Sequence, residues 1–206
     1  MLRDKLAALT PAVGAIVFVF AWWLLYASKL IDPVLLPSPQ DSFKAIWDGF
    51  VGGALISDFL ITVRRTLLAF VIAVIISVPL GIILGSSVRL YSSVEFLIDF
   101  FRSTPASALF PLFLVILGVG EETKIAVAAF GASLLILFNT AYGVMNARKT
   151  RQAAARVMGA SRFRVMLDVT LLESLPQTFV GMRTGVSFAL VIVIVAEMFI
   201  GSTDGL

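Results

Sequence analysis

The chain of 206 residues contains neither cysteine nor histidine. Without cysteine it forms no disulfide and carries no thiolate nucleophile. Without histidine it lacks the commonest metal ligand and the commonest acid or base at neutral pH. A Ser-His-Asp hydrolase and a zinc enzyme with histidine ligands are therefore excluded, and we expect no catalytic residue and no metal site.

Charged residues are scarce as well, at 14% of the chain, whereas hydrophobic residues make up 59%. The mean hydropathy is +1.01. Soluble domains carry about 25% charged and about 45–50% apolar residues, so this composition indicates an integral membrane protein. The net charge of +3 arises from charges that cluster in loops. Such clustering is a signal of membrane orientation, and we expect no nucleic-acid partner.

Five stretches approach or exceed the run of about 20 apolar residues that a helix needs to cross the hydrocarbon core. They are 11–29, 62–86, 104–119, 123–145 and 177–200. The third is short and contains Pro105 and Pro111, which is tolerable only where protein or water satisfies the freed backbone groups. The sequence therefore predicts an all-α fold, a polytopic bundle with five spans.

Basic residues alternate between the loops as expected for a cytoplasmic N-terminus. The loop between the fourth and fifth spans holds six of them: Arg148, Lys149, Arg151, Arg156, Arg162 and Arg164. Arg64 and Arg65 are the exception, because this orientation puts them near the outer end of the second span. They either face the bundle interior or extend to the membrane interface.

The two ends of the chain carry further expectations. The first apolar run ends in Trp22, Trp23 and Tyr26, which suit a membrane interface, so we expect an uncleaved helix rather than a signal peptide. Five spans with the N-terminus inside would leave 202–206 outside, and we expect that a sixth helix is missing. Residues 1–57 form an N-terminal helix and a periplasmic loop, with a helix over 43–51 capped by Asp41 or Ser42.

Two spans carry glycines four residues apart, which lets another backbone approach one face closely. The pairs are Gly81 with Gly85 and Gly181 with Gly185. They mark specific helix contacts, or they reflect the high frequency of such pairs in any membrane helix.

The stretch after the fourth span is too polar to cross a membrane and is patterned like two short helices. Ala153–Met158 is rich in helix formers, Gly159 can take the left-handed conformation that ends a helix, and Ser161 can cap a second helix through Leu167. This helix, glycine elbow and helix either fit a partner's cleft or form a basic cytoplasmic loop that happens to be helical.

Ala153-Ala154-Ala155, followed by Gly159, resembles the Glu-Ala-Ala-x-x-x-Gly motif of binding-protein-dependent ABC permeases. Gly159-Ala160-Ser161-Arg162 is similar to the run that follows this glycine in permeases of the nitrate, sulfonate and taurine type. Further similar segments, all within 34–206, are 36–39, 66–85, 111–112, 118–120, 175–176, 181–183 and 196–198. The chain departs from the pattern at Ala153, where the motif is acidic, and at Leu172, where it has a proline, although Pro176 follows.

The resemblance implies a type I ABC importer transmembrane domain, MetI-like, over 58–206, with a cytoplasmic coupling loop at 147–172. It implies partners: a cytoplasmic ATPase dimer that holds ATP and magnesium, a second permease copy and a periplasmic binding protein. The residues that would dock on the ATPase are Ala153, Ala154, Ala155, Met158, Gly159, Ala160 and Ser161. The nucleotide-binding pattern Gly-x-x-x-x-Gly-Lys-Ser/Thr is absent from this sequence.

The resemblance further implies a bacterial inner-membrane location and a small anionic cargo such as nitrate, taurine or an alkanesulfonate. A thiamine-precursor pyrimidine or another organic solute is the alternative cargo. From other classes, a secondary transporter driven by an ion gradient, an intramembrane enzyme and a membrane scaffold remain as alternatives. Few ionisable residues and no repeat speak against the first, and the missing histidine and cysteine against the second.

Two charged residues are candidates for the solute pathway or its gate. Glu197 lies within an apolar run and should face the bundle or water, either at a gate or in a structural hydrogen bond to a neighbouring helix. Arg102 could attract an anionic solute, but Glu95 and Asp99 could equally pair with it.

Overall fold

The computed structural model describes residues 2–200 and 205, with side chains for 13–53, 55–200 and 205. Every regular element in this described part is a helix, which confirms the predicted all-α class. The chain forms two compact units, Met1–Ser57 and Asp58–Leu206. The predicted chain end at 202–206 lies outside the described residues, apart from Gly205.

The first unit contains α1, Leu2–Ala27, and α2, Pro39–Val51. The Ser38 hydroxyl accepts a hydrogen bond from the Asp41 amide at 3.0 Å and caps α2. The predicted cap at Asp41 or Ser42 was therefore wrong, and the helix begins four residues earlier. Proline suits this first position, because its fixed φ matches a helix and its missing N–H would have no partner there.

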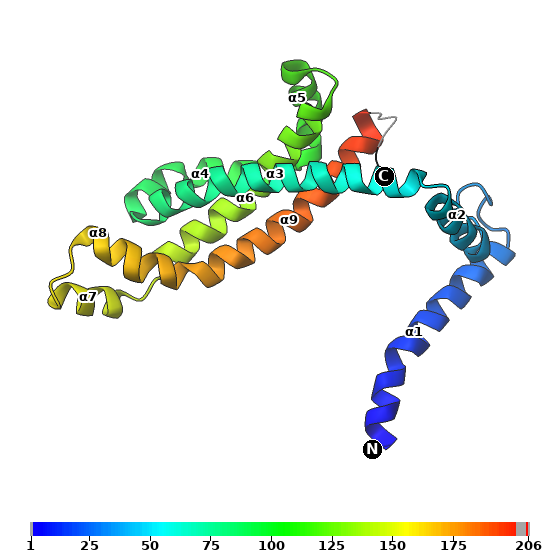
Figure 1. Cartoon of the computed structure of the whole chain (residues 1–206), viewed down its shortest axis with the longest axis horizontal. Coiled ribbons are helices and arrows are strands. Elements are labelled where there is room, and N and C mark those ends of the chain that lie inside the picture. Colours follow the sequence, from blue (N-terminus) through cyan, green and yellow to red (C-terminus); the bar gives the residue numbers. More distant parts are fainter. Residues whose placement is uncertain (1, 201–204, 206) are drawn as a thin grey trace. The chain divides into compact units, whose positions relative to one another are not determined.

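The second unit begins within α3, Ala54–Gly85, and continues through a series of helices (Figure 1). These are α4, Val88–Ser103; η1, Ala106–Leu109; α5, Phe110–Leu117; α6, Glu121–Met145; α7, Lys149–Val157; α8, Arg162–Val165; the π-helical turn η2, Met166–Leu171; and α9, Leu172–Ile200. Three described helices are long and apolar enough to cross a membrane: Leu55–Gly85, Glu121–Met145 and the continuous helix Arg162–Ile200. The apolar part of α1, Val13–Ala27, is shorter.

Both glycine pairs lie against α6. A Cβ added at Gly85 would lie 2.5 Å from the Ala141 carbonyl oxygen, and Gly81 is comparably close to α6. Added Cβ atoms at Gly181 and Gly185 would lie 2.6 and 2.8 Å from side chains of α6. The glycines thus mark specific contacts within the chain, by which α3 and α9 approach α6 closely.

Small side chains continue these contacts into the core of the second unit. One cluster contains most of the buried alanines of α3, α6 and α9: Ala69, Ala73, Ala128, Ala129, Ala132, Ala189 and Ala196. A hydrogen bond of 2.8 Å from Gln177 to Asn139 also joins α9 to α6. Close packing and interhelical hydrogen bonds are the interactions that hold helices together in lipid, where burial of apolar surface gives no advantage.

The third predicted span differs from the structure. Residues 88–103, expected to be a loop, form α4, and together with 106–117 they make a helix pair bent by 92°. Sequence hydropathy missed α4 because the helix is amphipathic: Tyr91 and Ile98 are buried against α6, while charged and polar side chains lie between its apolar ones. The fifth span also begins earlier than predicted, because the helix is continuous from Arg162.

We predict that Gly85→Ala destabilises the protein by about 1–3 kcal/mol, as overpacking does in tight cores, because the new Cβ would overlap a backbone oxygen of α6. Thermal unfolding of the purified protein in detergent measures the change. Gly14→Ala is the matched control, since no atom lies within 4 Å of a Cβ added there. Equal melting temperatures for Gly85→Ala and the unchanged protein would contradict the α3–α6 contact.

Candidate functional site

The loop between α6 and α9 has the predicted helix, elbow and helix. After α7 the chain turns at Gly159, whose φ is +87°. Residues other than glycine rarely adopt this backbone conformation. The Ser161 hydroxyl accepts a hydrogen bond from the Arg164 amide at 3.3 Å and caps α8. The local prediction is confirmed, except that the second helix runs on into α9.

An apolar tip, formed by Val157, Met158 and Phe163, surrounds this elbow. Their exposed fractions are 89%, 81% and 71%. Of the seven residues predicted to dock, Ala153, Ala154, Met158, Gly159 and Ser161 are exposed, Ala160 is half-buried and Ala155 is buried. Val157 and Phe163 lie outside the predicted docking set, which followed the alanines of the motif. The loop projects from one end of the second unit (Figure 1).

Glu173, in the first turn of α9, forms hydrogen bonds with the start of this loop. Its carboxylate accepts hydrogen bonds from the Arg148 amide at 2.5 Å and from the Arg151 guanidinium at 2.8 Å. The backbone amide of Arg148 lies directly before α7. The contact therefore ties the start of α7 to the start of α9.

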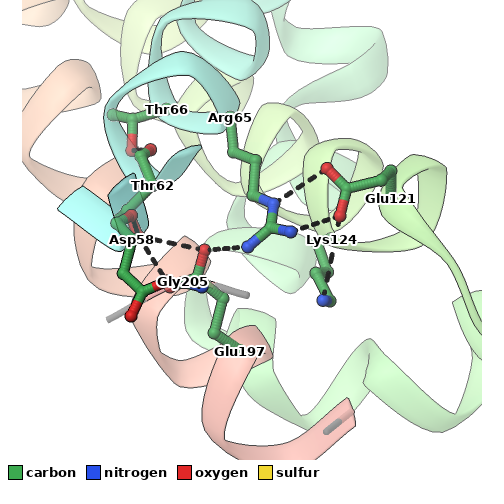
Figure 2. Close-up of polar contacts among 8 residues, drawn as sticks. All are labelled: Asp58, Thr62, Arg65, Thr66, Glu121, Lys124, Glu197 and Gly205. Carbon is green, nitrogen blue, oxygen red and sulfur yellow. Dashed lines mark hydrogen bonds and ion pairs between the residues drawn. The ribbon is translucent and has the colours of Figure 1, made fainter. Parts of the chain in front are cut away.

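An ion cluster centred on the buried Arg65 and Glu197 joins α3, α6 and α9 away from the loop (Figure 2). The Arg65 guanidinium contacts the Glu197 carboxylate at 2.5 Å and also pairs with Glu121, to which its Nε donates a hydrogen bond of 2.9 Å. The Thr62 hydroxyl donates to Glu197 at 2.9 Å. Exposed fractions of 3% for the Arg65 side chain and 1% for that of Glu197 show that the pair is removed from solvent and lipid.

Gly205 lies directly on this cluster. Its amide donates a hydrogen bond of 3.3 Å to Asp58, and a Cβ added to it would lie 2.6 Å from the Glu197 carboxyl carbon. Its φ of +126° likewise favours glycine. Gly205, a residue beyond α9, therefore also contacts the ion cluster. Lys124, which is buried, lies 4.0 Å from Glu121.

The sequence left two locations for Arg64 and Arg65, the bundle interior or the membrane interface. In the structure Arg65 faces the interior and Arg64 is exposed. Glu197 makes the hydrogen bond to a neighbouring helix that the sequence offered as one alternative, while its role as a gate stays a prediction. Glu121 was missed, although a buried arginine requires an acidic partner. In the described part of the chain, no three acidic side chains gather closely enough to hold a metal ion.

Arg102, the other predicted pathway residue, lies apart from the ion cluster. Its guanidinium carbon lies 3.9 Å from the centre of the Phe138 ring, and its Nη1 lies 3.4 Å from the Asp99 carboxylate. Asp99 is thus the partner, as the sequence allowed.

These features define a multi-pass helical membrane protein with a projecting basic loop. Comparison with known proteins identifies it further: residues 77–206 match the family described as the inner membrane component of binding-protein-dependent transport systems, and the chain belongs to this family. The predicted resemblance to ABC permeases is confirmed. Family members are components of membrane transport systems.

Relatives of the expected type align with nearly the whole chain. A taurine transport system permease of Escherichia coli K12 is 29% identical, covering 96% of this chain and 74% of the relative. A nitrate import permease of Synechocystis is 26% identical, covering 93% and 72%. A putative aliphatic sulfonates transport permease of Bacillus subtilis is 26% identical, covering 96% and 70%.

We predict that Arg65→Met destabilises the protein by about 3–5 kcal/mol, the cost of leaving one partner of a buried ion pair uncompensated. Arg64→Met is the matched control, because Arg64 is the exposed neighbour on the same helix. The double variant Arg65→Met/Glu197→Met should recover part of the lost stability, since the second change removes the unpaired charge. Thermal unfolding in detergent measures all three, and equal losses at Arg64 and Arg65 would contradict the buried pair.

Proposed function

We propose that this chain is the permease subunit of an ATP-driven ABC importer in a bacterial inner membrane, with its N-terminus in the cytoplasm. Two copies would form the solute pathway, served by a periplasmic binding protein and a cytoplasmic ATPase dimer. The family membership and the membrane-spanning helices support this proposal. Because the sequence lacks the nucleotide-binding pattern, ATP and magnesium belong to the ATPase partner.

The observation that carries the proposal is the apolar tip at the Gly159 elbow. Val157, Met158 and Phe163 are exposed on a loop that also carries exposed arginines. Exposed apolar patches rimmed by polar residues mark sites of protein interaction. The loop would dock in a groove of the ATPase, so that closure of the ATPase dimer pulls on the permease.

The cargo we propose is a small anion such as nitrate, taurine or an alkanesulfonate. The support comes from the relatives, whose names refer to taurine, nitrate and aliphatic sulfonates. A thiamine-precursor pyrimidine is the second candidate. A thermal-shift assay of the partner binding protein with these compounds distinguishes the two.

We predict that Gly159→Val uncouples transport while the protein remains inserted, because a β-branched side chain resists a φ of +87°. Gly159→Asn should retain coupling, since asparagine tolerates this conformation better than other residues. Apart from its chain neighbours, no atom lies within 4 Å of a Cβ added at Gly159, so the effect is conformational and not steric. Substrate-stimulated ATPase activity and uptake in reconstituted vesicles measure it, and normal values for Gly159→Val would overturn the elbow's role.

Cross-linking tests the docking face. The chain has no native cysteine, so Val157→Cys, Met158→Cys and Ala155→Cys each carry one cysteine-directed benzophenone. We predict strong photo-cross-links to the ATPase from 157 and 158 but weak ones from 155, because Ala155 is only 8% exposed. Mass spectrometry of the products identifies the partner. Adducts with lipid alone would argue against docking.

A further inference from the structure

Four polar side chains form a stripe along α4. Ser92, Glu95, Asp99 and Arg102 follow one another at spacings of three, four and three residues, which places them on one helix face. All four are exposed in the chain. The sequence predicted only that Glu95 or Asp99 could pair with Arg102, and no helical stripe, because 88–103 was expected to be a loop.

The polar stripe lies beside a membrane-spanning helix. Ile98 of α4 packs with Ala141 and Leu137 of α6, and the Arg102 guanidinium covers the ring of Phe138. Phe138 is seven residues, or about 10 Å of helix, from the end of α6. Ionised side chains at such a depth face water or protein and not lipid.

The stripe ends at a cavity. Where α4 stops and the helix pair bends by 92°, a space of about 360 Å³ lies among polar and aromatic side chains. Its lining includes Asp99, Arg102, Ser103, Thr104, Phe130 and Phe188. This volume lies within the range of about 300–1,000 Å³ typical of small-molecule sites. Irregular backbone at membrane depth is tolerated where it lines such a cavity, and broken helices form the solute sites of many transporters.

Arg102 brings a positive charge to this cavity. A guanidinium has five N–H donors, and among the described residues its acidic contact is Asp99, at 3.4 Å. The Asp99 side chain is 61% exposed and that of Arg102 is 34% exposed. Because both side chains are accessible, an anion can replace the Asp99 carboxylate at the Arg102 guanidinium.

We propose that the polar stripe lines the water-filled solute path and that Arg102, in the cavity at its end, binds the anionic group of the solute. The inference rests on the proposed function, since it assigns residues to the path of the importer. It explains why charged side chains remain exposed on a helix that packs along a membrane span.

Cysteine accessibility tests the path in the complete transporter, reconstituted with its ATPase. Ser92→Cys, Glu95→Cys and Asp99→Cys sample the stripe, and Phe96→Cys and Phe100→Cys are controls at exposed apolar positions of the same helix. With membrane-impermeant methanethiosulfonates added on both sides, we expect the stripe to react at least tenfold faster than the controls, because the thiolate forms only where water has access. Equal rates, or disulfides between permease copies at 95 and 99, would overturn the proposal.

The role of Arg102 is tested with charged reagents, independently of the cargo. In a Thr104→Cys background, Arg102→Gln should lower the ratio of anionic to cationic reagent rates severalfold, whereas Arg102→Lys should preserve it. Arg89→Gln, which removes an exposed charge at the start of α4, should leave the ratio unchanged. An unaltered ratio in Arg102→Gln would overturn anion binding by this residue. Both assays proceed without ATP hydrolysis, so their failure is distinguishable from failure of coupling at Gly159.

Discussion

Hydrocarbon cannot solvate an ionised side chain or an unpaired peptide group, so each such group in a membrane span needs a partner in protein or water. The chain meets this constraint in two ways. Arg65 and Glu197 neutralise each other inside the second unit, where both are shielded. Asp99 and Arg102 stay open, which requires water or another subunit beside α4. The constraint thus separates charges that hold the structure from charges available to a solute.

The close approach of helices makes the first arrangement feasible. Gly81 and Gly85 bring α3 against one part of α6, while Gly181 and Gly185 bring α9 against another. Side chains of the three helices can then meet within hydrogen-bond distance, as they do around Arg65. Small-residue packing and the ion cluster thus hold the same three helices together at different points along α6.

Local chemistry explains what could be predicted from the sequence. Gly159 and Ser161 determine their own backbone and cap, so the elbow was foreseen, and long apolar runs revealed α3 and α6. Tertiary contacts explain what could not. The amphipathic α4 lacks the hydropathy of a span, and Glu121 becomes the partner of Arg65 only after α6 packs beside α3.

The helix Arg162–Ile200 connects the loop to the ion cluster of the second unit. Its first turn follows the Gly159 elbow, and Glu197 lies near its last. A single continuous element therefore joins the loop to the ion cluster. The π-helical turn Met166–Leu171 and Pro176 lie close to the loop, and both are sites where helices bend. Both features lie before the segment in which Gly181 and Gly185 pack on α6.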